Sequence, residues 1–124
     1  MKDNYVSTIA RIVFALVMSF FALNHFMHPD MMTGAVPSFL PSPIIWVYVV
    51  AVALGLAALA ILSGVQVRLA GYLLGLLLII ILLSVHVPAI MNATDLAGKM
   101  GPMTMMLKDL GLAAAAFYMG SKHK

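Results

Sequence analysis

Four long apolar runs, separated by short segments rich in proline and polar residues, most constrain the fold of this chain. They cover about residues 8–27, 44–63, 68–87 and 102–120. A helix of roughly 20 apolar residues crosses the ~30 Å hydrocarbon core of a bilayer. Because the connections are short, neighbouring helices are expected to run antiparallel. The sequence therefore predicts an all-α membrane protein: one domain, residues 1–124, folded as a four-transmembrane-helix antiparallel bundle.

The composition leaves few charged side chains to cover a soluble surface. Hydrophobic residues make up 64% of the chain and charged residues 9%, whereas a soluble domain carries about 25% charged residues. Cysteine and glutamate are both absent. Their absence excludes disulfides and thiolate metal sites, and it argues against an exporter driven through a membrane-embedded glutamate.

Prolines mark the expected ends of the runs. Residues 28–43 form a proline-bearing loop, and the third span is expected to stop at Pro88. A second loop over 89–101 then leads to Pro102, which suits the first position of the fourth helix. The run Ile12–Leu23 is followed by no small-residue cleavage site, so we expect an uncleaved first span rather than a signal peptide.

Basic residues near the span ends predict the orientation, because cytoplasmic loops carry an excess of lysine and arginine. With the N-terminus inside, Lys99 alone falls on the outer side. The cytoplasmic side then holds Lys2, Arg11, Arg68, Lys122 and Lys124. We therefore expect both termini in the cytoplasm and the bundle in a bacterial-type inner membrane. The net charge of +3 is scattered, which argues against a nucleic-acid partner.

Small residues at a spacing of four mark expected helix contacts. Gly71 and Gly75 form a GxxxG pattern in the third span, and such spacing lets two backbones approach closely. Packing within the bundle is the simpler interpretation, and a homo-oligomer face remains an alternative.

Three of the four histidines are expected at the outer ends of spans. His25 and His28 end the first span beside Asn24, and His86 ends the third. Any one of them is explained by ordinary bonding to water and loop carbonyls at the membrane interface. Their coincidence at one level of the membrane favours a shared site.

The fourth span carries two charges, Lys108 and Asp109, six and seven residues past Pro102. That spacing puts them about 10 Å below the expected helix start. Ionisable residues at such depth usually face the bundle interior and mark a functional path. The alternative is a span that begins at Thr104, with Lys108 reaching outward and Asp109 bonding locally. Neighbouring residues face different ways on a helix, so we expect different partners, with Asp109 beside His25 or His86.

Two interpretations in which the protein binds a metal remain as alternatives. His25, His28 and His86 could ligate a metal, and two histidines on different spans could hold haem iron axially. Many methionines also fall at the outer loops and span ends, and thioethers suit Cu(I). Methionine equally fills irregular gaps in apolar contacts.

The order of several short motifs resembles the DoxX-like family of small four-span membrane proteins. These motifs are Arg11, Asn24-His25-Phe26, Arg68 after a glycine turn, His86-Val87-Pro88-Ala89 with Asn92, and Leu107-Lys108-Asp109-Leu110. The family often has an acid in the second span, near Leu54-Gly55-Leu56, and this chain has none there. The resemblance implies a link to quinone-dependent sulfur oxidation or to membrane redox complexes.

These observations predict a membrane subunit of a redox system that binds a quinone or similar lipophilic molecule near the outer leaflet. The catalytic residues stay unknown, and electrons are expected from a protein partner, because the chain lacks a flavin or nicotinamide fingerprint. The expected ligand-binding residues are Asn24, His25, His28, His86, Asn92, Lys108 and Asp109. A haem- or copper-binding protein and a non-enzymatic anchor or assembly partner are the alternatives.

Overall fold

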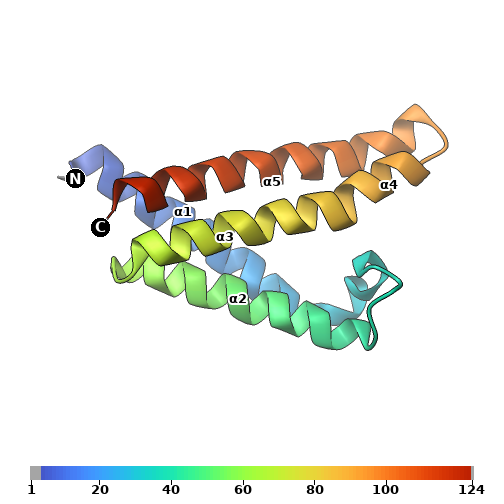
Figure 1. The fold of residues 1–124 in the computed structure, drawn as a ribbon, viewed down its shortest axis with the longest axis horizontal. Helices are drawn as coiled ribbons and strands as arrows, with labels where there is room; N and C mark the ends of the chain where they lie inside the picture. The colour runs from blue at the N-terminus through green and yellow to red at the C-terminus, as the bar shows by residue number, and fades with distance from the viewer. Residues whose placement is uncertain (1–3, 124) are drawn as a thin grey trace.

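The computed structural model describes residues 4–123, and these residues form an all-α protein (Figure 1). Within these residues, three helical segments are long and apolar enough to cross a membrane: α1 (Tyr5–Met27), α2 (Pro43–Ser63) and the continuous segment Val67–Asn92. That segment comprises α3 (Val67–Ile81), the π-turn η3 (Leu82–His86) and α4 (Val87–Asn92). The last helix, α5, runs over Leu96–Lys122. The expectation of an all-α protein with membrane-spanning helices is confirmed at this level.

Local sequence signals explain most helix ends. Asn4 caps α1, with its side chain accepting from the Ser7 N–H at 2.8 Å, and α1 ends before Pro29, which disfavours a helical residue ahead of it. Pro43 occupies the first position of α2, and Gly64 ends that helix with a φ of 81°. A left-handed glycine is a common helix terminator because it lacks a Cβ. The loop between α1 and α2 contains two short 3₁₀ turns, η1 (Pro29–Met31) and η2 (Thr33–Ala35).

Two expected boundaries in the second half of the chain are wrong. The third span does not stop at Pro88, since helix continues to Asn92, and the expected loop over 89–101 shrinks to residues 93–95. α5 begins at Leu96, so Pro102 lies inside it. A local feature accompanies each shifted boundary. The Asp95 carboxylate accepts from the Gly98 N–H at 2.8 Å and caps α5 early, while a π-turn accommodates Pro88.

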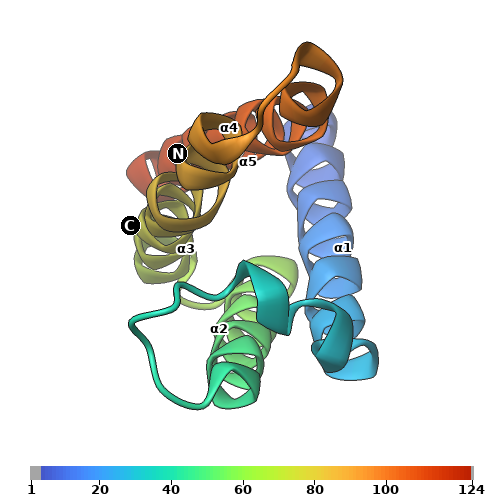
Figure 2. The same ribbon diagram turned by 90° about the vertical axis from the view of Figure 1, so that its right-hand side faces the viewer.

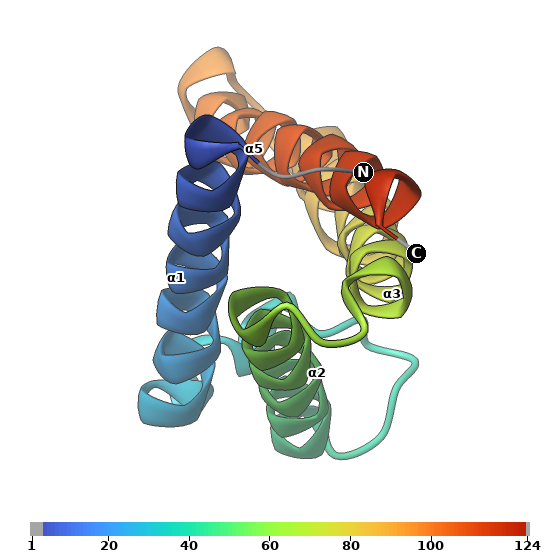
Figure 3. The same ribbon diagram turned by 90° about the vertical axis from the view of Figure 1, so that its left-hand side faces the viewer.

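The bundle consists of two closely packed pairs of helices. α1 packs along α2, and α3 packs along α5, with a smaller contact between α2 and α3. Figures 2 and 3 show the two pairs from opposite ends of the molecule. The core is continuous across both pairs and is made mainly of small and branched apolar residues, among them Ala15, Ala58, Ile61, Leu74 and Ala116, together with Met18. Large apolar side chains such as Leu16, Leu59 and Leu73 are exposed, as expected of a lipid-facing surface.

The GxxxG pattern of α3 faces α5, as the simpler interpretation predicted. A Cβ on Gly71 would lie 2.6 Å from the Ala116 carbonyl oxygen, and a Cβ on Gly75 would lie 2.8 Å from the Phe117 ring. These glycines therefore bring the two helices together within one chain.

Candidate functional site

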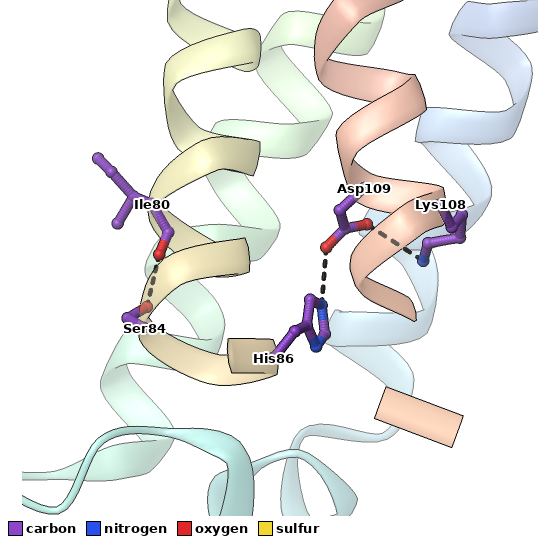
Figure 4. A network of polar contacts seen from close by, with 5 residues as sticks. All are labelled: Ile80, Ser84, His86, Lys108 and Asp109. Carbon is purple, nitrogen blue, oxygen red and sulfur yellow. Dashed lines mark hydrogen bonds and ion pairs between the residues drawn. The ribbon is translucent and has the colours of Figure 1, made fainter. Parts of the chain in front are cut away.

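A buried carboxylate between α3–α4 and α5 forms the centre of the site. Among the residues that the structure describes, Asp109 is the only charged residue that is buried, and 5% of its surface is exposed. Its Oδ2 lies 2.8 Å from Nε2 of His86, and its Oδ1 lies 3.4 Å from Nζ of Lys108. Figure 4 shows the two contacts reaching the carboxylate from different sides. Each carboxylate oxygen thus has its own partner, which offsets the cost of removing the charge from water.

The π-turn positions His86. Pro88 has no N–H and would clash with the carbonyl four residues earlier in a regular α-helix. The wider turn over Leu82–His86 avoids this conflict, with the Val87 N–H bonded to the Leu82 carbonyl. Ser84 donates to the Ile80 carbonyl at 2.7 Å within the same segment (Figure 4). Single π-turns inside helices occur frequently at functional sites.

Lys108 links the site to α1. Its Nζ lies 4.3 Å from the centroid of the Phe21 ring, and its side chain is 34% exposed. The expectation that Lys108 and Asp109 have different partners holds in part, since Phe21 contacts Lys108 and His86 contacts Asp109. It is wrong in that Lys108 also pairs with Asp109. A four-carbon stem is long and flexible enough to bring the ammonium back to a neighbouring side chain.

The arrangement supplies a hydrogen-bond donor, a positive charge and an oriented imidazole. Asp109 accepts the Nε2–H of His86 and so fixes the direction of the ring. Nδ1 of His86 has no hydrogen-bond partner among residues 4–123, and the side chain remains 12% exposed. His86 can therefore exchange a hydrogen bond or a proton with a ligand through its second ring nitrogen.

Comparison with known proteins assigns a family. Residues 14–117 match a family described as "Domain of unknown function (DUF8561)". The chain belongs to the DUF8561 family. No curated protein and no solved structure matches it. The DUF8561 match includes His86, Lys108 and Asp109, so the whole buried cluster lies within the family domain.

The other four expected site residues of this DUF8561 chain lie outside the cluster. Nδ1 of His25 is bonded to the Phe21 carbonyl at 2.7 Å, one turn earlier in α1. His28 is exposed just after α1, and Asn92 is exposed at the end of α4. Asn24 is half-buried, and its carbonyl accepts the His28 N–H at 2.9 Å. The expected pairing of Asp109 with a histidine is present, and that histidine is His86.

The histidine metal site is not supported in this DUF8561 structure. Within residues 4–123, no three histidine or acidic side chains are grouped closely enough to hold a metal ion. His25, His28 and His86 are therefore not one ligand set. Helix geometry separates them: His25 bonds to its own helix, His28 lies beyond the helix end, and His86 bonds to Asp109.

Two features of the DUF8561 fold were missed at the sequence level. Nη1 of Arg11 donates to the carbonyls of Ile61 and, at 3.3 Å, Leu62 at the end of α2, and this contact joins α1 to α2. The π-turn was also missed. Its only sequence signal is Pro88 within an apolar run that continues to Met91.

Proposed function

We propose that all four long helices span a bacterial-type inner membrane, with both termini in the cytoplasm. α5 has 27 residues, or about 40 Å of helix, and it packs along α3. Both termini lie at the same end of the molecule (Figure 1). A helix that runs antiparallel along a spanning neighbour crosses the same thickness of bilayer.

The distribution of charge supports this orientation. Arg11, Arg68 and Lys122 belong to the end that carries the termini, and Lys99 belongs to the other end. Lys2 and Lys124 were also counted among the basic residues expected on the cytoplasmic side, and they lie outside the described residues. The excess of basic residues at the end with the termini favours a cytoplasmic position for that end.

We further propose that the protein is the membrane subunit of a redox system and binds a quinone or a similar lipophilic carbonyl compound at His86. The observation that carries this proposal is the buried Asp109, held between His86 and Lys108 inside a helix bundle. Ionisable residues at membrane depth are retained where they act on a substrate, ion or proton. A partly exposed imidazole beside a lysine is suited to a ligand with a polar head and an apolar body.

Quinone chemistry matches these groups. A quinone carbonyl accepts hydrogen bonds, and full reduction to the quinol takes two electrons and two protons. One ring nitrogen of His86 faces Asp109 and the other is unoccupied by protein. In its doubly protonated form His86 can donate Nδ1–H to the carbonyl while Nε2–H stays bonded to Asp109, and it can pass the Nδ1 proton to the reduced oxygen. Lys108 supplies positive charge where negative charge develops on the oxygen. Electrons are expected from a partner subunit.

The resemblance to the DoxX-like family supports the same class of function. That family often has an acid in its second span, and this chain has none near Leu54–Leu56. Here the carboxylate comes from Asp109 in α5 instead. A function that requires an acid in the second span is therefore not proposed.

Quinone binding by purified protein tests the proposal directly. Equilibrium dialysis of a radiolabelled short-chain ubiquinone analogue should give saturable binding, and His86→Ala should weaken it about tenfold, the equivalent of one lost hydrogen bond. His86→Gln keeps a side-chain donor and should bind between the two. His28→Ala removes an exposed histidine and should bind like the original protein. Equal affinity of His86→Ala and the original protein would contradict the proposal.

The same preparation distinguishes the alternatives. A Soret band in the absorption spectrum would identify a haem protein, and stoichiometric copper in elemental analysis would identify a copper protein. Copurification of a partner without saturable quinone binding would favour an anchor or assembly role.

A further inference from the structure

α1 and α5 leave an open hollow between them on the side of the molecule that carries the termini. Its volume is about 560 Å³, and its wall is one stripe of α1 together with a single residue of α5. The lining residues are Val6, Ile9, Ala10, Val13, Phe14 and Val17 of α1 and Leu112 of α5. The stripe is wholly apolar and extends about 17 Å along α1. That length is close to half of the ~30 Å hydrocarbon thickness, which is the depth of one leaflet.

A second hollow of about 310 Å³ adjoins the first and shares Ala10 and Phe14 with it. Its wall includes the basic side chains Arg11 and Lys122 near the ends of the two helices. Among the described residues that line either hollow, none is acidic. The two hollows together therefore form a trough with an apolar body and a basic mouth. Figure 3 shows the backbones of α1 and α5 from the end of the molecule that carries the termini.

The two cations at the mouth have no carboxylate partner among residues 4–123. Arg11 donates from Nη1 to the end of α2, while its Nε is buried without a hydrogen-bond partner in that part of the chain. Nζ of Lys122 lies 5.5 Å from the centroid of the Tyr118 ring. Two positive charges without a carboxylate partner, beside an apolar surface, attract an amphiphile with a negatively charged head.

We propose that this trough is a binding site for an anionic phospholipid. Its phosphate is held at the mouth by Lys122, and Arg11 in the same wall adds positive charge, since ammonium groups make strong charge-assisted hydrogen bonds to phosphate. One acyl chain lies along the stripe from Ala10 to Val17. Free phosphate is a poorer occupant because it leaves that apolar stripe uncovered. The site shares no residue with the His86–Asp109 cluster, so the proposal does not depend on quinone binding.

Native mass spectrometry of protein released from mixed vesicles tests this assignment. From vesicles of equal parts phosphatidylglycerol and phosphatidylcholine, the protein should retain one phosphatidylglycerol, with a preference of about tenfold, the equivalent of one charge-assisted hydrogen bond. Lys122→Gln should remove most of the preference. Lys99→Gln, which removes a lysine at the opposite end, should leave the preference unchanged.

A lipid site and a simple anion site differ in their need for the apolar stripe. Val13→Trp should fill the apolar body and reduce retention of the phospholipid while the helical circular dichroism stays unchanged. Excess inorganic phosphate should not displace the lipid. Equal retention of the two phospholipids by the original protein, or an unchanged preference in Lys122→Gln, would overturn the proposal. Displacement by inorganic phosphate would also overturn it, because it would show an anion site without an acyl chain.

Discussion

The unequal exposure of the two partners of Asp109 determines how much each contributes. His86 is 12% exposed and meets the carboxylate at 2.8 Å, whereas Lys108 is 34% exposed and lies 3.4 Å away. A hydrogen bond to a buried charge stabilises a fold more than a partly solvated ion pair, because removing its donor leaves the charge desolvated and unpaired. We infer that His86 is the main structural partner and that Lys108 is freer to respond to a ligand.

Removing each partner in turn should show this difference. We expect His86→Ala to lower the free energy of unfolding by about 2–3 kcal/mol, since Asp109 then stays buried with Lys108 alone. Lys108→Gln should cost less than about 1 kcal/mol. The measurement is reversible unfolding in mixed micelles, followed by circular dichroism. In the double variant His86→Ala/Asp109→Asn, much of the loss should be recovered, because no uncompensated charge remains. A larger cost for Lys108→Gln than for His86→Ala would reverse the assignment.

Small residues let the second pair of helices approach closely. Gly71 and Gly75 of α3 meet the backbone of Gly120 and the ring of Phe117 on α5. Asp109 lies on the same buried side of α5 as Ala113, Ala116 and Gly120. The close approach of α3 to α5 therefore also sets how near the π-turn comes to Asp109.

A matched pair of glycine substitutions tests this packing. Gly71→Ala places a Cβ 2.6 Å from the Ala116 carbonyl oxygen, so the helices must separate, at a cost of about 1–3 kcal/mol. Gly111→Ala adds the same methyl group on α5, where nothing lies within 4 Å, and should gain up to about 1 kcal/mol from helix propensity. Thermal unfolding of both variants gives the comparison. Equal effects of the two substitutions would show that α3 and α5 are not held at this contact.

Sequence patterns predicted the bounds of the first two helices better than the directions in which key side chains point. The apolar runs predicted α1 and α2 to within three residues of their observed ends. The direction of His86 was not predictable from helical phase, because it lies within a π-turn, and one extra residue in a turn rotates the next part of the helix by about 100°. The early start of α5 had a signal in Asp95, a favoured capping residue, which Pro102 outweighed in the sequence interpretation.

The trough between α1 and α5 could not be predicted from the sequence either. α1 and α5 are both apolar along much of their length, and apolar pattern alone does not distinguish a lipid-facing surface from a helix contact in a membrane protein. Packing of α1 onto α2 is instead favoured by small residues, as where Gly55 lies beside Ala22. Arg11 adds a polar link between the same two helices.

The crossing of the bilayer by α5 can be tested because the chain contains no native cysteine. Single cysteines at two positions report its two ends: Thr94, exposed in the loop before α5, and Ser121, exposed near its C-terminal end. In intact cells, a membrane-impermeant maleimide should label Thr94→Cys directly and should label Ser121→Cys only after permeabilisation. Gly34→Cys in the α1–α2 loop should behave like Thr94→Cys, and Val65→Cys in the α2–α3 turn should behave like Ser121→Cys. The unmodified chain, which has no thiol, gives the background. Labelling of Thr94→Cys and Ser121→Cys from the same side would show that α5 lies along the membrane surface, and the buried cluster would then lie near that surface rather than inside the bilayer.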